Sequence, residues 1–246
     1  MQADPSAQRA LLLIADLETR MAQLRHRKQR LPEHAQLAEL AARRAELAEQ
    51  LVASQTRLGD AQTEQDRIES DLEPARARLE RNQGTIDAGA ADAKVLQSLI
   101  EETRHLRGRI SDLEDAQLDS MQAIEDETAV HDGVAARKAE LEQGIRELLA
   151  NRDAAIGDLD GQIGNLDLQR SQLAAGLPAD VVALYDRIAA RTNGTGAAEC
   201  RARRCTGCGL ELDVSVLKRL ANAAPSELLR CEECGRILVR TDQSGL

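Results

Sequence analysis

The sequence predicts a mainly α protein, in which a long antiparallel coiled-coil hairpin precedes a small, cysteine-rich β domain at the C-terminus. The 246 residues include one Tyr and no Phe or Trp, which argues against a large core packed with aromatic side chains. Charged residues make up 30% of the chain, as is typical of long exposed helices. All five cysteines lie between residues 200 and 234, so the cysteine-rich part is separate from the helical part.

The charge of the chain limits the partners that it can attract. The net charge is −10, but residues 199–246 carry 8 Lys/Arg against 7 Asp/Glu, so the excess of acid lies before residue 199. An acidic chain repels phosphate backbones, and any contact with nucleic acid would have to be local. No run approaches the ~20 apolar residues of a membrane span, and the N-terminus lacks the pattern of a signal peptide. We therefore expect a cytoplasmic protein.

A heptad pattern covers most of the first 80 residues. Apolar residues alternate in steps of four and three, as in a left-handed coiled coil. Pro32 interrupts the pattern, whereas Pro74 lies within it. We therefore expect a helix to end at Pro32 and a continuous helix to be kinked at Pro74. The predicted contact positions are Ala10, Ile14, Leu17, Met21, Leu24, Leu37, Leu40, Leu47, Leu51, Ser54, Leu58, Ala61, Gln65, Ile68, Leu72, Ala75 and Leu79.

A second heptad segment runs from about residue 94 to 176, where Gly176-Leu-Pro178 ends it. Two glycines and an asparagine lie between the two segments, and the segments are similar in length. This match favours an antiparallel hairpin with its tip near residues 84–92 over a parallel dimer. We assign residues 1–178 to the hairpin, 179–198 to a short helix and linker, and 199–246 to the C-terminal domain.

The C-terminal domain contains two matched C-x-x-C-G motifs, at Cys205–Gly209 and Cys231–Gly235. Each motif can form a tight turn that presents two sulfurs to one ion, and four thiolates form the closed tetrahedral set of a structural zinc site. The metal ligands are therefore predicted to be Cys205, Cys208, Cys231 and Cys234, holding one structural Zn²⁺ in a zinc ribbon. Iron also accepts four thiolates, and a redox role is the alternative for either motif alone.

The remaining residues complete a small β ribbon with a helical insertion. Val216, Leu217 and Leu220 have helical spacing, and residues 237–240 read as a closing strand. Cys200 is most simply a plain small residue on the strand that approaches the first motif; a reactive thiol and an alternative metal ligand are the other two interpretations. We expect the domain to lose its fold without metal, because the ion would replace most of its core.

The architecture resembles a bacterial family of coiled-coil hairpin proteins with a C-terminal C4-type zinc ribbon. Residues 231–238, C-E-E-C-G-R-I-L, are similar to the closing signature of that family. Residues 184–188, L-Y-D-R-I, resemble the run before its ribbon, and residues 94–99 match the start of its second helix more loosely. The family has an aromatic residue where this chain has Val239. The resemblance implies a nucleic-acid-binding or adaptor protein, and some relatives partner an alternative sigma factor.

Two functions follow from these features. The first is a non-enzymatic adaptor that binds proteins through its coiled coil and its ribbon, with a link to transcription. The second is an RNA- or DNA-binding protein, for which the basic residues of the ribbon are the candidates: Arg201, Arg203, Arg204, Lys218, Arg219, Arg236 and Arg240. We favour the adaptor because the chain lacks aromatic residues that stack on bases. No phosphate loop, nucleophile motif or open metal site predicts an enzyme.

Overall fold

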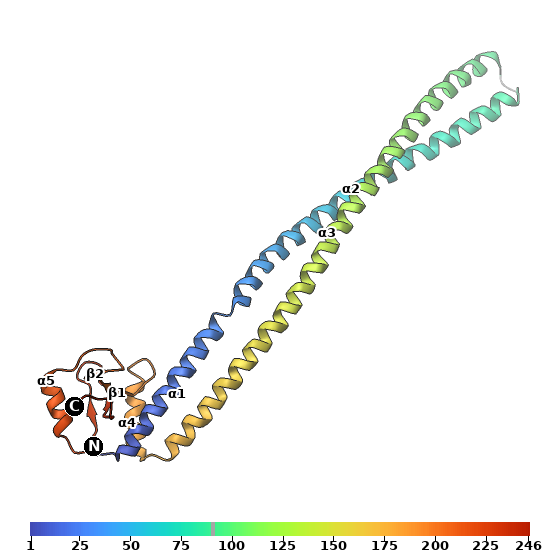
Figure 1. Cartoon of the computed structure of the whole chain (residues 1–246). Helices are drawn as coiled ribbons and strands as arrows, with labels where there is room; N and C mark the ends of the chain where they lie inside the picture. Colours follow the sequence, from blue (N-terminus) through green and yellow to red (C-terminus); the bar gives the residue numbers. More distant parts are fainter. Residues whose placement is uncertain (90–91) are drawn as a thin grey trace. The chain divides into compact units, whose positions relative to one another are not determined.

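The computed structural model describes residues 1–89 and 92–246 (Figure 1). Long helices account for most of the chain, and short strands occur only near its C-terminus within the described residues. In chain order the elements are α1 (Pro5–Gln29), α2 (Pro32–Asp87), α3 (Ala93–Ala175), α4 (Ala179–Ala189), β1 (Ala197–Arg201), β2 (Arg204–Cys205), α5 (Val214–Asn222), β3 (Leu229–Arg230) and β4 (Ile237–Val239).

The chain forms two compact units. Residues 35–148 make up the hairpin unit, and residues 1–34 together with 149–246 make up the ribbon unit. The ribbon unit therefore includes the first helix of the chain and the last part of α3. None of the described helices is both long and apolar enough to cross a membrane.

The hairpin unit is an antiparallel pair formed by α2 and α3, as predicted. The predicted contact positions of α2 are buried or half-buried along its length, while the residues between them face solvent. One core cluster joins Leu72 and Ala75 of α2 to Ile110 of α3. The helix continues through Pro74, which confirms that this proline does not end it. Apolar residues repeating every seven positions thus hold the two helices together.

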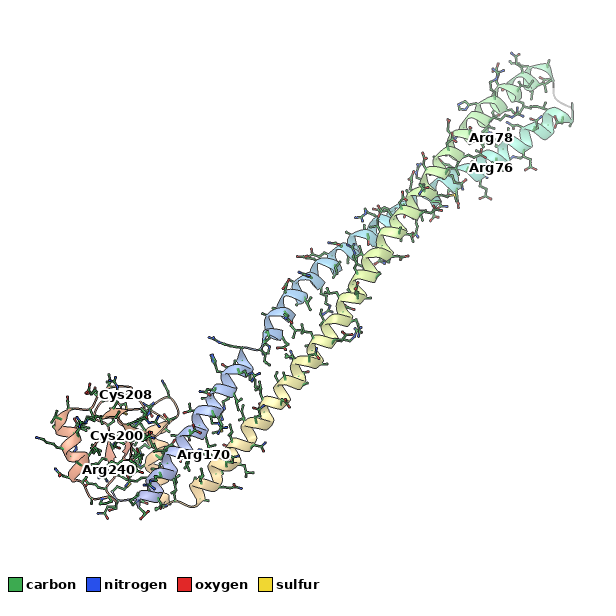
Figure 2. The ribbon with its side chains drawn as sticks, in the orientation of Figure 1. Arg76, Arg78, Arg170, Cys200, Cys208 and Arg240 are labelled. Carbon is green, nitrogen blue, oxygen red and sulfur yellow. The ribbon has the colours of Figure 1, made fainter. Side chains whose placement is uncertain are left out.

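Ion pairs flank this apolar contact. Arg57 lies 2.9 Å from Glu127, and Arg76 lies 2.5 Å from Glu114. Arg76 and Arg78 are labelled on α2 in Figure 2, and Arg78 pairs with Glu102 of α3. Exposed pairs of this kind contribute little to stability, each about 0–1 kcal/mol. Their main effect is to favour one antiparallel alignment of the two helices over others.

The tip residues of the hairpin mostly stabilise helix ends. Asp92 accepts hydrogen bonds from the backbone N–H groups of Lys94 and Val95, and so caps the start of α3. Gln83 donates to the carboxylate of Asp87 at 3.0 Å. Part of the predicted tip, residues 90–91, lies outside the described residues.

In the ribbon unit, α1 packs against the last part of α3. Leu17 and Met21 of α1 form a core cluster with Leu166 of α3. The helix starts at an Asp4 cap followed by Pro5, a favourable order for a helix N-terminus. It ends at Gln29, and α2 begins at Pro32, so the helix is interrupted at the position that this proline predicts.

The sheet of the ribbon unit has four strands in the order β2-β1-β4-β3. Strand β1 pairs parallel to β4, and the other two pairs are antiparallel. The sheet begins at Ala197, two residues before the predicted boundary at residue 199. Side chains alternate between its faces, so that Ala197, Ile237 and Val239 point one way, whereas Ala198 and Leu238 point the other.

The two faces of the sheet are covered by different elements. Ile237 and Val239 pack with Leu11 and Ile14 of α1 and with Tyr185 of α4 and their neighbours. The opposite face packs against α5 and the cysteines, through Val216, Leu220 and others. The expectation that a metal ion replaces most of the core is therefore wrong, because helices α1 and α4 supply a full apolar layer.

Both ends of the chain are built into this unit. The backbone N–H of Ala3 donates to the carbonyl of Ser226 at 2.7 Å, and the N–H of Leu228 donates to the carbonyl of Met1. The buried side chain of Gln8 donates to the carbonyls of Ala3 and Pro225. The loop between α5 and β3 is thus held by the first residues of the chain.

Candidate metal centre

The two C-x-x-C-G motifs bring four sulfurs together. The Sγ atoms of Cys205, Cys208, Cys231 and Cys234 all lie within 4.8 Å of one another. Two of the separations, from Cys205 to Cys234 and from Cys208 to Cys231, are 3.9 Å. Four sulfurs about 2.3 Å from a tetrahedral zinc would be about 3.8 Å apart. A disulfide needs about 2.05 Å, so the arrangement fits one ion and excludes bridges between these pairs.

The two motifs fold in the same way. The N–H of Gly209 donates to the carbonyl of Cys205 at 2.8 Å, and the N–H of Gly235 donates to the carbonyl of Cys231 at 2.9 Å. Both glycines have positive φ, +74° and +72°, which residues with a side chain rarely adopt. The glycine after each second cysteine is therefore required for the turn that points both sulfurs inward.

An arginine precedes each motif and completes it. The Nε atom of Arg204 donates to the carbonyl of Gly209 at 3.2 Å, and the Nε atom of Arg230 donates to the carbonyl of Gly235 at 2.8 Å. The repeated pattern is thus R-C-x-x-C-G. From the sequence, both arginines count only as basic residues near the metal motifs, in favour of nucleic-acid binding, although their matching position before both motifs was a visible signal.

The environment of the sulfurs favours a bound cation. Burial raises the pKa of the Cys205 thiol, and it also raises the pKa of the Cys231 thiol. Backbone N–H groups of the two motifs donate to these sulfurs and offset part of that effect. Four thiolates at this spacing, two of them buried and two half-buried, would be unfavourable without a cation, whereas a divalent ion compensates their charge. Because four sulfurs complete a tetrahedron, the cluster offers no position for a reacting water.

The fifth cysteine lies outside the cluster. Cys200 is fully buried on β1, where its Sγ atom lies 3.9 Å from the carbonyl of Ser244. Burial raises the pKa of this thiol, which disfavours the reactive thiolate form. The structure therefore supports the simplest of the three interpretations of Cys200, that of a small core residue.

Two of the candidate binding arginines have their guanidinium groups occupied by backbone carbonyls. Arg236, from the C-G-R-I-L run, donates to the carbonyls of Thr192, Thr195 and Gly207. It thereby ties the segment after α4 to the first motif. Arg240, labelled in Figure 2, donates to four carbonyls after α5: those of Leu220, Ala223, Ala224 and Pro225. Both side chains are half-buried and serve the fold of the ribbon.

The other candidate binding residues are more exposed than Arg236 and Arg240. None of the side-chain hydrogen bonds or ion pairs of the described residues links them to one another. Arg201 pairs with Glu199 at 2.6 Å, and Arg219 pairs with Glu232 at 2.7 Å. Arg203 donates to the carbonyl of Gly245 at 2.9 Å. Lys218 is exposed on α5, and within the described residues no carboxylate forms an ion pair with it.

The L-Y-D-R-I run also has a structural role. Tyr185 is fully buried, and its hydroxyl donates a hydrogen bond to the carboxylate of Glu18 on α1. Arg170 of α3 donates to Glu18 at 2.8 Å and to Asp186 of α4 at 2.6 Å. These four side chains join three helices at the edge of the ribbon, and burial raises the pKa of the Tyr185 hydroxyl so that it stays a donor.

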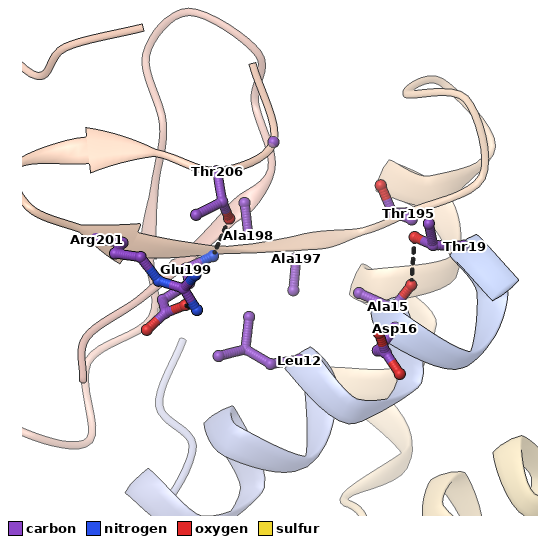
Figure 3. A pocket seen from close by; sticks show the side chains of 11 residues that line it. Leu12, Ala15, Asp16, Thr19, Thr195, Ala197, Ala198, Glu199, Arg201 and Thr206 are labelled. Atoms are coloured by element: carbon purple, nitrogen blue, oxygen red, sulfur yellow. Dashed lines mark hydrogen bonds and ion pairs between the residues drawn. The ribbon is translucent and has the colours of Figure 1, made fainter. Parts of the chain in front are cut away.

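A cavity of about 370 Å³ lies between α1 and β1 (Figure 3). Leu12, Ala15 and Ala197 form its apolar side. The charged groups at its rim are already paired, Asp16 with Arg20 and Glu199 with Arg201. This cavity therefore offers no free charge with which to select a ligand.

Comparison with known proteins assigns the chain to a family. The model of the CT398-like coiled-coil hairpin domain matches residues 14–193, and the model of the C4-type zinc ribbon domain matches residues 204–238. The chain belongs to the CT398-like coiled-coil hairpin family. The resemblance inferred from the sequence is thus confirmed, and so is the fold class.

Relatives in this family share the full length of the chain. The uncharacterized protein Rv2229c of Mycobacterium tuberculosis is 30% identical over 98% of both chains, and the uncharacterized protein ML1638 of Mycobacterium leprae is 27% identical over 91% of this chain and 96% of its own. A solved structure from Mycobacterium smegmatis is 32% identical, with a TM-score of 0.86 and coverage of 98% of this chain and 100% of that one.

Two further solved structures resemble the chain in fold alone. The structure of CT398 from Chlamydia trachomatis is 16% identical to this chain, with a TM-score of 0.65 and coverage of 96% and 98%. The HP0958 protein of Helicobacter pylori is 15% identical, with a TM-score of 0.51 and coverage of 97% and 98%.

Proposed function

We propose that this protein is a non-enzymatic adaptor, in which the coiled coil and a zinc-stabilised ribbon each present a protein-binding surface in the cytoplasm, with the transcription machinery as one candidate partner. The observation that carries the proposal is the closed four-cysteine cluster, because such a set stabilises a fold and leaves no open position for catalysis. One Zn²⁺ per chain would hold the two motifs together and support the loops around them.

The internal use of the arginines favours protein binding over nucleic-acid binding. Phosphate contacts need guanidinium or ammonium groups that are free to approach the backbone of the nucleic acid. Arg236 and Arg240 instead donate to carbonyls of the ribbon itself. Tyr185, the single Phe, Tyr or Trp residue, is buried and engaged with Glu18, so its ring is not available for stacking.

Metal analysis tests the role of the cluster. We expect about one zinc ion per chain in protein purified without chelator, and loss of that zinc in the Cys231→Ser variant. The Cys200→Ser variant is the matched control and is expected to keep its zinc. A native protein that binds iron, or no metal, would contradict the zinc assignment.

Partner capture tests the adaptor role. The tagged full chain is recovered from native lysate with and without nuclease, and the bound molecules are identified. Protein partners that survive nuclease support the adaptor. Recovery of RNA or DNA, with loss of all partners after nuclease, would instead support the second candidate function, binding of nucleic acid by the ribbon, for which exposed Lys218 is the first residue to replace.

A further inference from the structure

A groove of about 540 Å³ lies beside the second motif, between α4 and the loop that holds Cys234. One side is formed by Leu184, Arg187 and Ile188 of α4 and by Arg191 just after the helix, and the opposite side by residues 230 and 232–235. Arg187 lies in the last turn of α4, and Arg191 lies in the turn that follows the helix, so both basic side chains border the groove on the same side. The groove therefore combines an apolar floor with a basic wall.

The charges of this groove are poorly balanced by its surroundings. Arg187 and Arg191 are exposed, and within the described residues neither guanidinium forms an ion pair or a hydrogen bond. Arg230 uses its Nε atom for the carbonyl of Gly235 and is otherwise exposed. Glu232 is already paired with Arg219. Three guanidinium groups thus face one unpaired carboxylate, that of Glu233.

The apolar floor decides what kind of anion would fit. Leu184 is half-buried, and Ile188 beneath it is buried, so the floor can pack against an aliphatic side chain of a ligand. A nucleic-acid strand would gain little there, because it needs aromatic stacking partners, which this groove lacks. A peptide with acidic residues around a leucine would match both the wall and the floor.

We propose that this groove between α4 and the second motif docks an acidic segment of a partner protein, with carboxylates on Arg187, Arg191 and Arg230 and an aliphatic side chain over Leu184 and Ile188. The proposal rests on the adaptor function and specifies one of its binding surfaces. It also gives the metal site a role in binding, because the Gly235 turn fixes the wall that carries Arg230.

The test measures binding of a fluorescein-labelled decapeptide, in which glutamates flank a Leu-Leu pair, to the full zinc-loaded chain. The Arg187→Glu/Arg191→Glu double variant is expected to weaken binding about tenfold or more. The control variant Arg9→Glu/Arg104→Glu changes the net charge equally, at two exposed residues outside the groove, and is expected to bind within about twofold of the original chain. A peptide with glutamines in place of the glutamates, and one with serines in place of the leucines, should both bind more weakly.

The outcomes separate this proposal from the adaptor function. Zinc content and melting temperature of the double variant show that its ribbon is intact, and Arg187→Ala/Arg191→Ala repeats the test without introducing new charge. Absence of peptide binding, equal loss in the control variant, or tighter binding of a twelve-nucleotide oligouridine to the same groove would overturn the proposal. If the double variant captures cellular protein partners as well as the original chain does, the groove is not their docking site. That result would overturn the docking proposal and still support the adaptor function. Peptide binding without any cellular protein partner would overturn the adaptor instead.

Discussion

The hydroxyl of Tyr185 on α4 donates to the carboxylate of Glu18 on α1, which lies 167 positions earlier in the chain. The carboxylate also accepts from Arg170 at the end of α3, and its side chain is only 13% exposed. One buried acid therefore joins the first helix, the third helix and the helix that leads into the ribbon.

We expect Tyr185→Phe to weaken this junction by about 1–2 kcal/mol, because Glu18 keeps Arg170 but loses a buried hydrogen bond. Hydrogen exchange at the backbone amides of residues 185–199 would detect faster local opening. The matched variant Glu18→Gln retains an oxygen that accepts from Tyr185 but loses the charge that attracts Arg170. Unchanged exchange in the phenylalanine variant would show that apolar packing alone holds α4.

Replacing the arginine before either cysteine motif should loosen the metal site. Arg204→Ala or Arg230→Ala leaves a glycine carbonyl without its donor, and we expect zinc transfer to a chelator to become about tenfold faster. A chromogenic chelator follows this rate directly. Arg203→Ala is the control, because Arg203 binds the carbonyl of Gly245 rather than a motif glycine. Equal rates in all three variants would mean that the arginines do not support the site.

The heptad contacts of the hairpin unit should dominate its stability. Leu72 is 2% exposed and Leu118 is 65% exposed, although both lie on helices of the same unit. We expect Leu72→Ala to reduce the free energy of unfolding by about 2–4 kcal/mol, and Leu118→Ala to change it by less than about 0.5 kcal/mol. Urea titration followed by circular dichroism at 222 nm measures both. Similar losses for the two variants would contradict the contact register of the coiled coil.

The ribbon should not fold as an isolated fragment, even with zinc. A chain of residues 197–246 would expose Ile237 and Val239, which α1 and α4 cover in the full protein. We expect poor dispersion of its amide resonances with one equivalent of zinc, in contrast to the same residues in the full chain. A well-dispersed spectrum that matches the full chain would show that the metal and α5 suffice for the fold.

Much of this architecture could be predicted because its signals are local. The spacing of Leu, Ile and Ala fixes which face of α2 is buried, and the two C-x-x-C-G motifs place four sulfurs close together before any tertiary contact is known. Pro32 is also a local signal, because a proline interrupts a helix whatever the rest of the chain does, and it marks the break between the first two helices.

The rest depends on contacts between residues far apart in the chain. Nothing near Leu11 indicates that it packs against Val239, and nothing near Arg236 indicates that it donates to the carbonyl of Thr192. From the sequence, a basic residue near a metal site is interpreted as a binding residue. The half-buried position and the carbonyl partners of Arg236 show instead that it stabilises the ribbon. Arg187 and Arg191 were missed because they precede the cysteine-rich segment.

The pairing of Met1 and Ala3 with residues 226–228 has a consequence for how the protein is made. Residues 1–3 are translated more than 220 residues before these partners, which is a delay on the order of 10–40 s at bacterial rates of translation. During that interval the apolar face of α1 that meets the sheet has nothing to cover it. We therefore expect this face of α1 to stay exposed during synthesis until strand β4 has been made.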